Sequence, residues 1–481
     1  MVALLPITSM PLVVNLVGSN AVAAPSGLLL LALVFLWLIP YLLHGGSFPL
    51  QTIPFLLFCL AAVASTALSF FWGAPPRKFA DPLFTSLSAL LTLGIGASFY
   101  LSAAAWPVTE EKMRLTLKVI NWSGLVVILW TLTQAGAWYM FHRYPDWMRT
   151  VHGFYSVGTL FRQRFVGFAL EPSWLAHQLN MLYLPWWLAA SVKSFSVHRW
   201  RIGKFSFENI LLAFGSLILA MTLSRVGLGV FLLMIGFLAL RKALSFSRWL
   251  QTKAASMLKT QGKSSLSRFG IDILVLGGLA VVFLVLILVV GFALSRLDQR
   301  MATLFQLDFL EQDNPINYLA DKLSLAARLV YWKSGWLVFN DHPWFGVGLG
   351  SAGYYLPDYL DGFAWRLSEV RTIIFRSGEL LNTKNIWIRI LAETGMVGFS
   401  FFLCWLYINW TTARAMEENS HCLPAVLGTM AILMLIGLPM EGFSLDTFAL
   451  PYIWFSLGLM LAAWKISRNR LSNFAIEEPK K

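Results

Sequence analysis

Apolar stretches of about 20 residues recur along most of this 481-residue chain, with short polar connections between them. A helix that crosses a membrane needs about 20 mostly apolar residues, and it satisfies its backbone polar groups internally. The composition agrees, because 57% of the residues are hydrophobic and 13% are charged, whereas about a quarter of the residues in soluble domains are charged. The sequence therefore predicts an all-α polytopic membrane protein.

We predict twelve membrane-spanning helices. One long apolar run is interrupted at Ser224-Arg225. A single straight helix of that length would exceed the bilayer thickness, so we expect a hairpin with Arg225 at its tip. The predicted spans are residues 4–24, 27–43, 50–71, 83–105, 115–140, 171–192, 207–223, 225–241, 271–294, 385–410, 423–438 and 447–465.

Lysine and arginine gather in connections that the positive-inside rule assigns to the cytoplasm. Segments 193–204 and 241–268 are basic and contain no Asp or Glu, and the C-terminal tail begins with Lys465 and Arg468. Both termini are therefore expected in the cytoplasm, and the N-terminal stretch is interpreted as a first span rather than a cleaved signal. Membrane topology accounts for the net charge of +13, so nucleic-acid binding is not needed to explain it.

Counting spans from these regions places the Ser224-Arg225 turn outside the cytoplasm, together with segments 141–170, 294–384 and 439–446. Arg77-Lys78 is a basic exception on that side. Segment 141–170 interleaves aromatic residues with arginines, which is typical of an element at the membrane surface. The organisation expected is residues 1–293 with nine spans, 294–384 as an extracytoplasmic loop that carries the chemistry, 385–466 with three spans, and 467–481 as a cytoplasmic tail.

The long loop is predicted to be partly helical. Apolar residues recur at helical spacing over Tyr318–Phe339. His342-Pro343 and the glycines that follow predict the end of this helix and a turn. We therefore expect a folded loop between spans nine and ten, not an extended connection.

Basic side chains gather at the predicted extracytoplasmic ends of spans, where charge is costly and so often functional. Several cations around one site would bind a polyanion, because guanidinium groups form paired hydrogen bonds with phosphate oxygens. The alternative is that each arginine extends separately to lipid headgroups. The residues concerned are Arg162, Arg164, Arg225, Arg328 and Lys384.

Glu171, Lys384 and His342 each have a functional and a structural interpretation. Glu171 begins a predicted span, so it either complements the helix dipole or acts as a general base for a sugar hydroxyl. Lys384 is a phosphate ligand, a desolvated base or an interfacial anchor. His342 precedes a proline in a turn, where a structural role is more common.

Acidic residues near the last spans are also ambiguous. Glu441 and Asp446 either bind a cation and shape the site or are solvated loop charges. Arg389 and Glu393 are four residues apart and are expected to pair across one helical turn. The chain contains no P-loop, H-E-x-x-H or G-x-S-x-G motif. Its three cysteines form no C-x-x-C. We therefore expect neither a metal site nor a cofactor.

Four short segments together resemble the O-antigen ligase and O-antigen polymerase superfamily of bacterial envelope enzymes. They are Gly167–Ala176, Thr222–Gly227, Arg328–Gly348 and Asn385–Gly398, and the resemblance covers roughly residues 160–400. The twelve predicted spans and the large loop between spans nine and ten also fit the family.

The chain departs from the ligase pattern at one position. That pattern has His and Asn, then nine residues, then Gly-x-x-Gly. Asn385, Gly395 and Gly398 keep this spacing here, and Lys384 stands in the His position. The departure argues against a lipopolysaccharide core ligase in particular, and Glu171-Pro172-Ser173 is closer to polymerase-like members.

The resemblance implies transfer of a glycan from a polyprenyl (undecaprenyl) diphosphate to an acceptor sugar hydroxyl, outside the cytoplasmic membrane of a bacterium and without a metal. The partners implied are this donor, the glycan acceptor and the lipid bilayer, and no nucleic acid. Polymerase is the first interpretation, and ligase and transporter of a lipid-linked glycan are the alternatives. The expected catalytic residues are Glu171, Arg225, Arg328 and Lys384, and the expected substrate contacts are Arg162, Arg164, Tyr331, His342 and Asn385.

Overall fold

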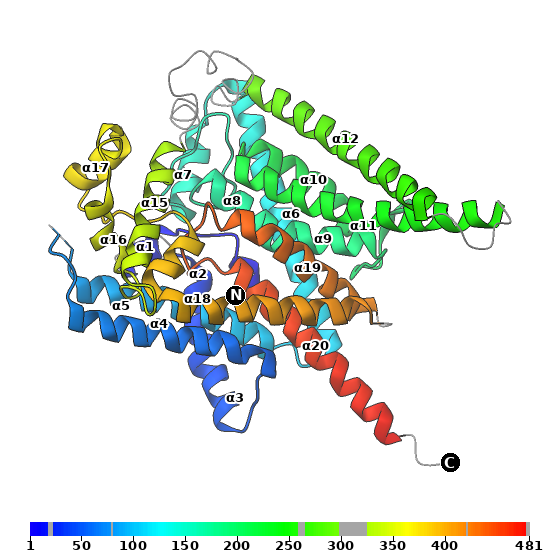
Figure 1. Ribbon diagram of the computed structural model, residues 1–481, viewed down its shortest axis with the longest axis horizontal. Helices are drawn as coiled ribbons and strands as arrows, with labels where there is room; N and C mark the ends of the chain where they lie inside the picture. The colour runs from blue at the N-terminus through cyan, green and yellow to red at the C-terminus, as the bar shows by residue number, and fades with distance from the viewer. Residues whose placement is uncertain (18–22, 78–79, 258–264, 298–324, 420–421, 478–481) are drawn as a thin grey trace. The chain divides into compact units, whose positions relative to one another are not determined.

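The computed structural model describes residues 1–17, 23–77, 80–257, 265–297, 325–419 and 422–477 (Figure 1). The chain divides into two compact units. One comprises Met1–Leu228 and Ala327–Lys481, and the other comprises Gly229–Ala326. The described residues of both units are mainly helical.

The N-terminal part of the first unit contains long helices joined by short turns. A single antiparallel hairpin of β1 (Arg201–Ile202) and β2 (Phe205–Ser206) interrupts the helices of this part, as far as the described residues show. The helices are η1 (Val2–Leu4), α1 (Pro11–Val17), α2 (Pro25–Leu33), η2 (Val34–Leu38), α3 (Ile39–Leu43), η3 (Leu50–Thr52), α4 (Ile53–Trp72), α5 (Pro82–Ala105), α6 (Glu110–Phe141), α7 (Asp146–Tyr155), α8 (Pro172–Gln178), η4 (Leu179–Tyr183), α9 (Leu184–Val192) and α10 (Phe207–Met221).

The C-terminal part of the first unit begins with short helices and ends with three long ones. Helix α18 packs against α4 and α19, and α20 packs against α5 (Figure 1). The elements are α15 (Ala326–Asp341), α16 (Ala352–Tyr355), η6 (Leu356–Tyr359), η7 (Ala364–Arg366), α17 (Ser368–Arg376), α18 (Ile386–Glu417), α19 (Cys422–Glu441) and α20 (Tyr452–Glu477).

The described residues of the second unit form two long helices, α11 (Arg225–Met257), which starts in the first unit, and α12 (Ser265–Leu297). Nε2 of Gln251 donates to Oδ1 of Asp272 at 2.8 Å, which ties the two helices together. Helix α11 continues well beyond the predicted span 225–241, because the basic sequence that follows it is also helical.

Eight helices among the described residues are long and apolar enough to cross a membrane, which confirms an all-α membrane protein. The count of twelve is not confirmed. The eight are Pro25–Leu43, Leu50–Trp72, Pro82–Ala105, Glu110–Phe141, Arg225–Lys253, Phe269–Phe292, Ile386–Glu417 and Cys422–Glu441.

The predicted span 4–24 is wrong as a single helix. Ser9 forms isolated bridges with Ala23 and Ser156, and the side chain of Thr8 accepts from Leu170 N at 2.9 Å, so this segment includes extended chain. The predicted spans 171–192, 207–223 and 447–465 are largely helical, but none is among the eight. Among them, Phe207–Met221 is apolar but has only 15 residues.

The interruption predicted at Ser224-Arg225 is confirmed. Helix α10 ends at Met221, and Leu223 has a positive φ of 51°. Oγ1 of Thr222 accepts from Ser224 N at 3.1 Å, which stabilises the turn before α11 starts at Arg225.

The basic exception at Arg77 has a local cause. Its Nη2 lies 2.7 Å from Oδ1 of Asp358, and its Nε donates to the carbonyl of Tyr354 at 2.8 Å. Arg77 therefore contacts the segment that follows α15. A carboxylate partner explains a basic residue at this position.

The described part of the long loop is folded around a small core of its own. Buried residues from α15, η6 and α17 pack together, including Tyr331, Leu356 and Val370. Helix α15 confirms the predicted helix from Ala326 onward, and residues 318–324 lie outside the described residues. This core fixes α15 and α17 beside the start of α18.

Candidate functional site

The glycine-rich turn after α15 docks against a break in α18. Val347 N donates to Ala392 O at 2.9 Å, and Met396 N donates to Pro343 O at 2.7 Å. Gly395 interrupts the helix with a φ of 61°, and a Cβ there would overlap the carbonyl of Trp344. A Cβ at Gly346, where φ is 67°, would lie 2.5 Å from Ala392 O. Both glycines are needed because two backbones meet here.

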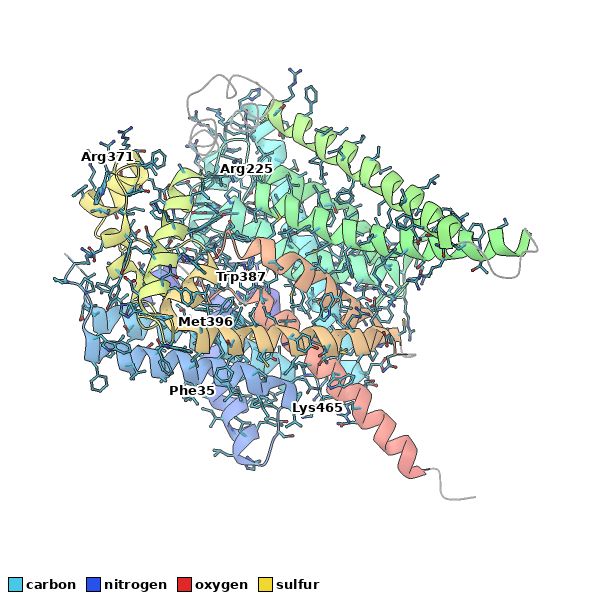
Figure 2. The ribbon with its side chains drawn as sticks, in the orientation of Figure 1. Phe35, Arg225, Arg371, Trp387, Met396 and Lys465 are labelled. Carbon is cyan, nitrogen blue, oxygen red and sulfur yellow. The ribbon has the colours of Figure 1, made fainter. Side chains whose placement is uncertain are left out.

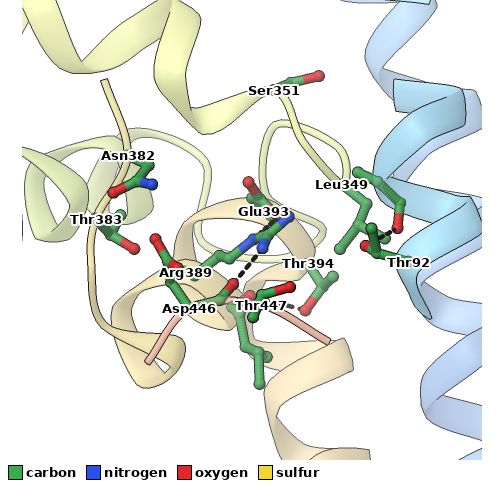
Figure 3. Close-up of polar contacts among 12 residues, drawn as sticks. Thr92, Leu349, Ser351, Asn382, Thr383, Arg389, Glu393, Thr394, Asp446 and Thr447 are labelled. Carbon is green, nitrogen blue, oxygen red and sulfur yellow. Dashed lines mark hydrogen bonds and ion pairs between the residues drawn. The ribbon is translucent and has the colours of Figure 1, made fainter. Parts of the chain in front are cut away.

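Arg389 and Glu393 pair across one turn of α18, as their spacing predicted. The distance from Nε of Arg389 to Oε2 of Glu393 is 2.9 Å, and the Glu393 side chain is 5% exposed. Nη1 of Arg389 also donates to the carbonyl of Asp446 (Figure 3). This buried arrangement attaches the loop after α19 to the first turns of α18.

Asn385 begins α18 as its N-cap. Its Oδ1 accepts from Trp387 N at 2.9 Å and from Ile388 N at 3.2 Å. Ile386 N donates to Gly442 O at 2.9 Å, so the loop after α19 is fixed here as well. The structure thus uses the Asn385 side chain to start the helix.

Lys384 lies immediately before this cap, in a strained left-handed conformation with a φ of 47°. Such a conformation costs a non-glycine residue roughly 1–2 kcal/mol, and strain of this kind is typical of functional sites. The Lys384 ammonium forms an ion pair with Glu369 of α17 and lies 5.6 Å from the ring centre of Tyr331.

Tyr331 of α15 also contacts Glu369. Its hydroxyl donates to Oε1 of Glu369 at 3.4 Å. Burial and the neighbouring Glu369 carboxylate raise the pKa of Tyr331 above its ordinary value. Glu369 was not among the predicted site residues, because it is separated by fifteen residues from Lys384 and only the fold of the loop brings them together.

Arg328 lies one helical turn before Tyr331 on α15. Its Nη1 donates to Oγ of Ser444 at 3.3 Å. The rings of Trp332 and Phe443 pack at 5.2 Å between centroids, so the loop after α19 runs along the start of α15. The structure therefore brings Arg328, Tyr331 and Lys384 together around the start of α18.

A second group of predicted residues gathers at the start of α8. Glu171 precedes Pro172, and its Oε2 accepts from Ser173 Oγ at 3.1 Å. Nε of Arg164 donates to the carbonyl of Thr222 at 3.3 Å, which places it at the turn before Arg225. Arg162 is exposed.

Arg225 is connected to α8 through the first turn of α11. Nδ2 of Asn180 donates to the carbonyl of Gly227 at 2.8 Å, and a Cβ at Gly227 would lie 2.6 Å from the Cβ of Ala176. Figure 2 labels Arg225 at this point and Trp387 in the first turn of α18. Arg225 is thus held where α8, α10 and α11 meet.

His177 and Glu441 form a buried pair between these two groups. Nδ1 of His177 lies 3.0 Å from Oε1 of Glu441, and the side chains are 2% and 5% exposed. The interpretation of Glu441 as a solvated loop charge is therefore wrong. His177 was not predicted, although a histidine within an otherwise apolar span is a signal of function.

His342 is separated from these groups. It lies between the rings of Trp72 and Tyr355, with centroid distances of 6.2 Å and 5.6 Å. Fourteen residues of α15 separate it from Arg328, which is about 21 Å along a helix. The structure therefore places it beside α4 and α16, away from the start of α18.

Within the described part of the chain, no group of three or more His, Cys, Asp or Glu side chains could hold a metal ion. The functional groups that the structure assembles are instead cations with a few carboxylates. Such a set binds and stabilises anionic oxygen.

Residues 210–403 match the family model described as O-antigen ligase. This region is an O-antigen ligase family domain. The matched region contains Arg225, Arg328, Lys384, the glycine-rich turn and the break in α18, which confirms the resemblance to the O-antigen ligase and polymerase superfamily. No curated protein matches the chain.

The domain and the apolar helices together identify a multi-pass protein of the bacterial inner membrane. It is a membrane enzyme of the O-antigen ligase and polymerase type, which acts in polysaccharide biosynthesis. Glu171, His177 and Glu441 lie outside the matched residues.

Proposed function

We propose that this enzyme transfers a glycan from a polyprenyl diphosphate, such as undecaprenyl diphosphate, to an acceptor sugar hydroxyl on the extracytoplasmic side, as a polysaccharide polymerase. One observation carries the proposal. Arg328 and Lys384 converge beside Tyr331 at the start of α18, within the region that matches the O-antigen ligase family.

The cations suit a diphosphate leaving group. Negative charge develops on the diphosphate as the glycosidic bond breaks, and preorganised donors stabilise that charge most in a site that excludes water. Arg328 is positioned by Ser444, and Arg225 is held at the start of α11. In this proposal both guanidinium groups bind the diphosphate, and no metal takes part.

Lys384 stands where ligases have a histidine, and in this proposal it is a third phosphate ligand. Its ammonium is paired with Glu369 across a partly exposed contact. A diphosphate carries more charge than one carboxylate, so the donor competes with Glu369 for the ammonium. The left-handed backbone at Lys384 holds the side chain over Tyr331 while this exchange takes place.

In this proposal, the residues near α8 bind the acceptor glycan. Glu171 accepts a hydrogen bond from a neighbouring hydroxyl in the structure, and it is proposed to bind or deprotonate the acceptor hydroxyl. Arg162 and Arg164 contact the glycan or its phosphates, and Tyr331 offers an aromatic face to a sugar ring. The alternative, a ligase, uses the same chemistry with a different acceptor.

The test is transfer by the purified protein in nanodiscs, with an undecaprenyl-diphosphate oligosaccharide as donor and with EDTA present. Products are resolved by gel and mass spectrometry. A ladder of longer lipid-linked glycans supports a polymerase, and a single transfer to an added acceptor supports a ligase. Movement of the donor across liposome membranes without any glycan transfer would refute the proposed enzyme activity and favour a transporter.

Variants test the site itself. Arg225→Ala and Arg328→Ala should each lower kcat by about 100-fold or more, as the loss of one oriented donor does elsewhere. Arg371→Ala, an exposed arginine on α17, is the matched control and should retain the wild-type rate. Full activity in both Arg225→Ala and Arg328→Ala would refute the proposed diphosphate site.

A further inference from the structure

The buried pair of His177 on α8 and Glu441 on α19 is not used by the proposed diphosphate site. The ring of Tyr452 from α20 packs edge-on against the imidazole, with 5.6 Å between ring centroids. Burying ionisable side chains costs free energy of desolvation unless their polar atoms are paired. Ionisable residues retained at such a cost within a membrane bundle are typically functional.

Each partner also keeps one polar atom without a hydrogen bond. Nε2 of His177 and Oε2 of Glu441 are buried and have no partner among the described residues. Asn180, one turn further along, has an unpartnered Oδ1 in the same part of the structure. Each such atom costs about 1–3 kcal/mol. Buried polar atoms without hydrogen-bond partners on two neighbouring helices therefore indicate that a polar group of a ligand binds there.

This pair lies between the two halves of the candidate site. His177 follows Glu171 by six residues, which is about 9 Å along a helix. Glu441 adjoins Gly442, whose carbonyl accepts from Ile386 N next to the Lys384 segment. A π-helical turn, η4 (Leu179–Tyr183), begins two residues after His177, and such turns are frequent at functional sites.

Building on the proposed glycan transfer, we propose that His177 takes the proton from the acceptor hydroxyl and that Glu441 orients it. The carboxylate of Glu441 accepts the Nδ1–H of His177, so that Nε2 carries the lone pair. A carboxylate in this position fixes the tautomer and later stabilises the imidazolium. Glu171 then binds the acceptor without taking its proton.

The transfer step is balanced without any further reactant. The hydroxyl oxygen bonds to the anomeric carbon, and the bond from that carbon to the diphosphate oxygen breaks. The diphosphate leaves with the electron pair, and the hydroxyl proton passes to Nε2 directly or through one bridging water. The groups that face His177 from neighbouring helices are Glu441 of α19 and Tyr452 of α20.

The first test compares pH–rate profiles of His177→Gln and Glu171→Gln with the wild type. His177→Gln should lower kcat by about 100-fold or more and remove the acid limb of the profile. Its Kd for a fluorescent polyprenyl diphosphate should stay within about twofold of wild type, because the cations that bind diphosphate are intact. A wild-type rate in His177→Gln, or loss of the acid limb in Glu171→Gln alone, would overturn the proposal.

Variants of Glu441 separate proton transfer from a purely structural role. Glu441→Gln should lower kcat, because the imidazolium that forms during transfer loses the carboxylate that stabilises it. Glu441→Asp keeps the charge and should restore most of the rate. Equal behaviour of the Gln and Asp variants would show that the carboxylate is not needed.

A measurement without turnover keeps this proposal distinct from the proposed function. ¹⁵N-histidine NMR of the protein in nanodiscs should show His177 as the neutral Nδ1–H tautomer, and Glu441→Gln should alter that signal. Addition of the acceptor oligosaccharide should shift its Nε2 resonance. An Nε2–H tautomer, or no response to the acceptor, would refute the dyad even if the enzyme transfers glycans, and failure of transfer alone would count against the function instead.

Discussion

Removal of the Glu393 carboxylate should destabilise the protein far more than removal of the Glu369 carboxylate. Both residues pair with a cation, but Glu393 is 5% exposed and Glu369 is 46% exposed. Removing one partner of a buried pair costs about 3–5 kcal/mol, because the other charge stays buried without compensation. An exposed pair contributes about 0–1 kcal/mol.

The structure indicates what is left in Glu393→Ala. Arg389 would keep the carbonyl of Asp446 as an acceptor and lose its carboxylate. We therefore expect a loss of unfolding free energy of about 3 kcal/mol or more for Glu393→Ala, and of at most about 1 kcal/mol for Glu369→Ala. The assay is reversible unfolding in mixed micelles of increasing SDS content, followed by tryptophan fluorescence.

A double variant tests whether the uncompensated charge causes this loss of stability. Arg389→Met with Glu393→Leu removes both charges and should be less destabilising than Glu393→Ala alone, because no unpaired ion remains. Equal destabilisation by Glu393→Ala and Glu369→Ala would refute the reasoning from burial. A double variant that is worse than either single change would also contradict it.

Three further predictions follow from the same structure. Gly395→Ala should lower the unfolding free energy by at least about 1–2 kcal/mol, because it adds left-handed strain to a clash with Trp344; SDS unfolding equal to wild type would contradict this. Lys384→His should retain part of the transfer rate and Lys384→Ala should not, if the position binds diphosphate; equal rates would argue against that role. Hydrogen bonds from Lys333 and from a backbone amide lower the pKa of Asp361 from 3.8. The ionised Asp361 carboxylate should therefore stabilise the folded protein at neutral pH, and this stabilisation should be lost as the pH falls below 3.8. The difference in stability between wild type and Asp361→Asn, measured from pH 7 to pH 3, should therefore shrink with acidification.

Part of the candidate site could be predicted from the sequence. Arg225, Arg328 and Lys384 could be named because charge beside apolar spans is unusual. Glu369 and His177 could not be connected to them, since the contacts Lys384–Glu369 and His177–Glu441 join residues that are distant in the chain or lie on different helices. The place of His342, about 21 Å along α15 from Arg328, also required the fold.

The sequence by itself determined the class of structure and most of its helices. Apolar runs of bilayer length have few alternatives to helix, because unpaired backbone groups are too costly in lipid. The local sequence also determined the interruption at Ser224-Arg225, through its charge, and the turn after Asp341, through its proline and glycines.

Only the tertiary structure decided which polar groups meet and which segments stop being helical. Residues 4–24 are apolar enough for a span, yet Ser9 pairs with Ala23 and Ser156 instead. Gly346 and Gly395 are explained only when the turn after α15 meets the break in α18. Long-range contacts set these outcomes, because the burial of a charge and the approach of two backbones depend on partners that the local sequence does not contain.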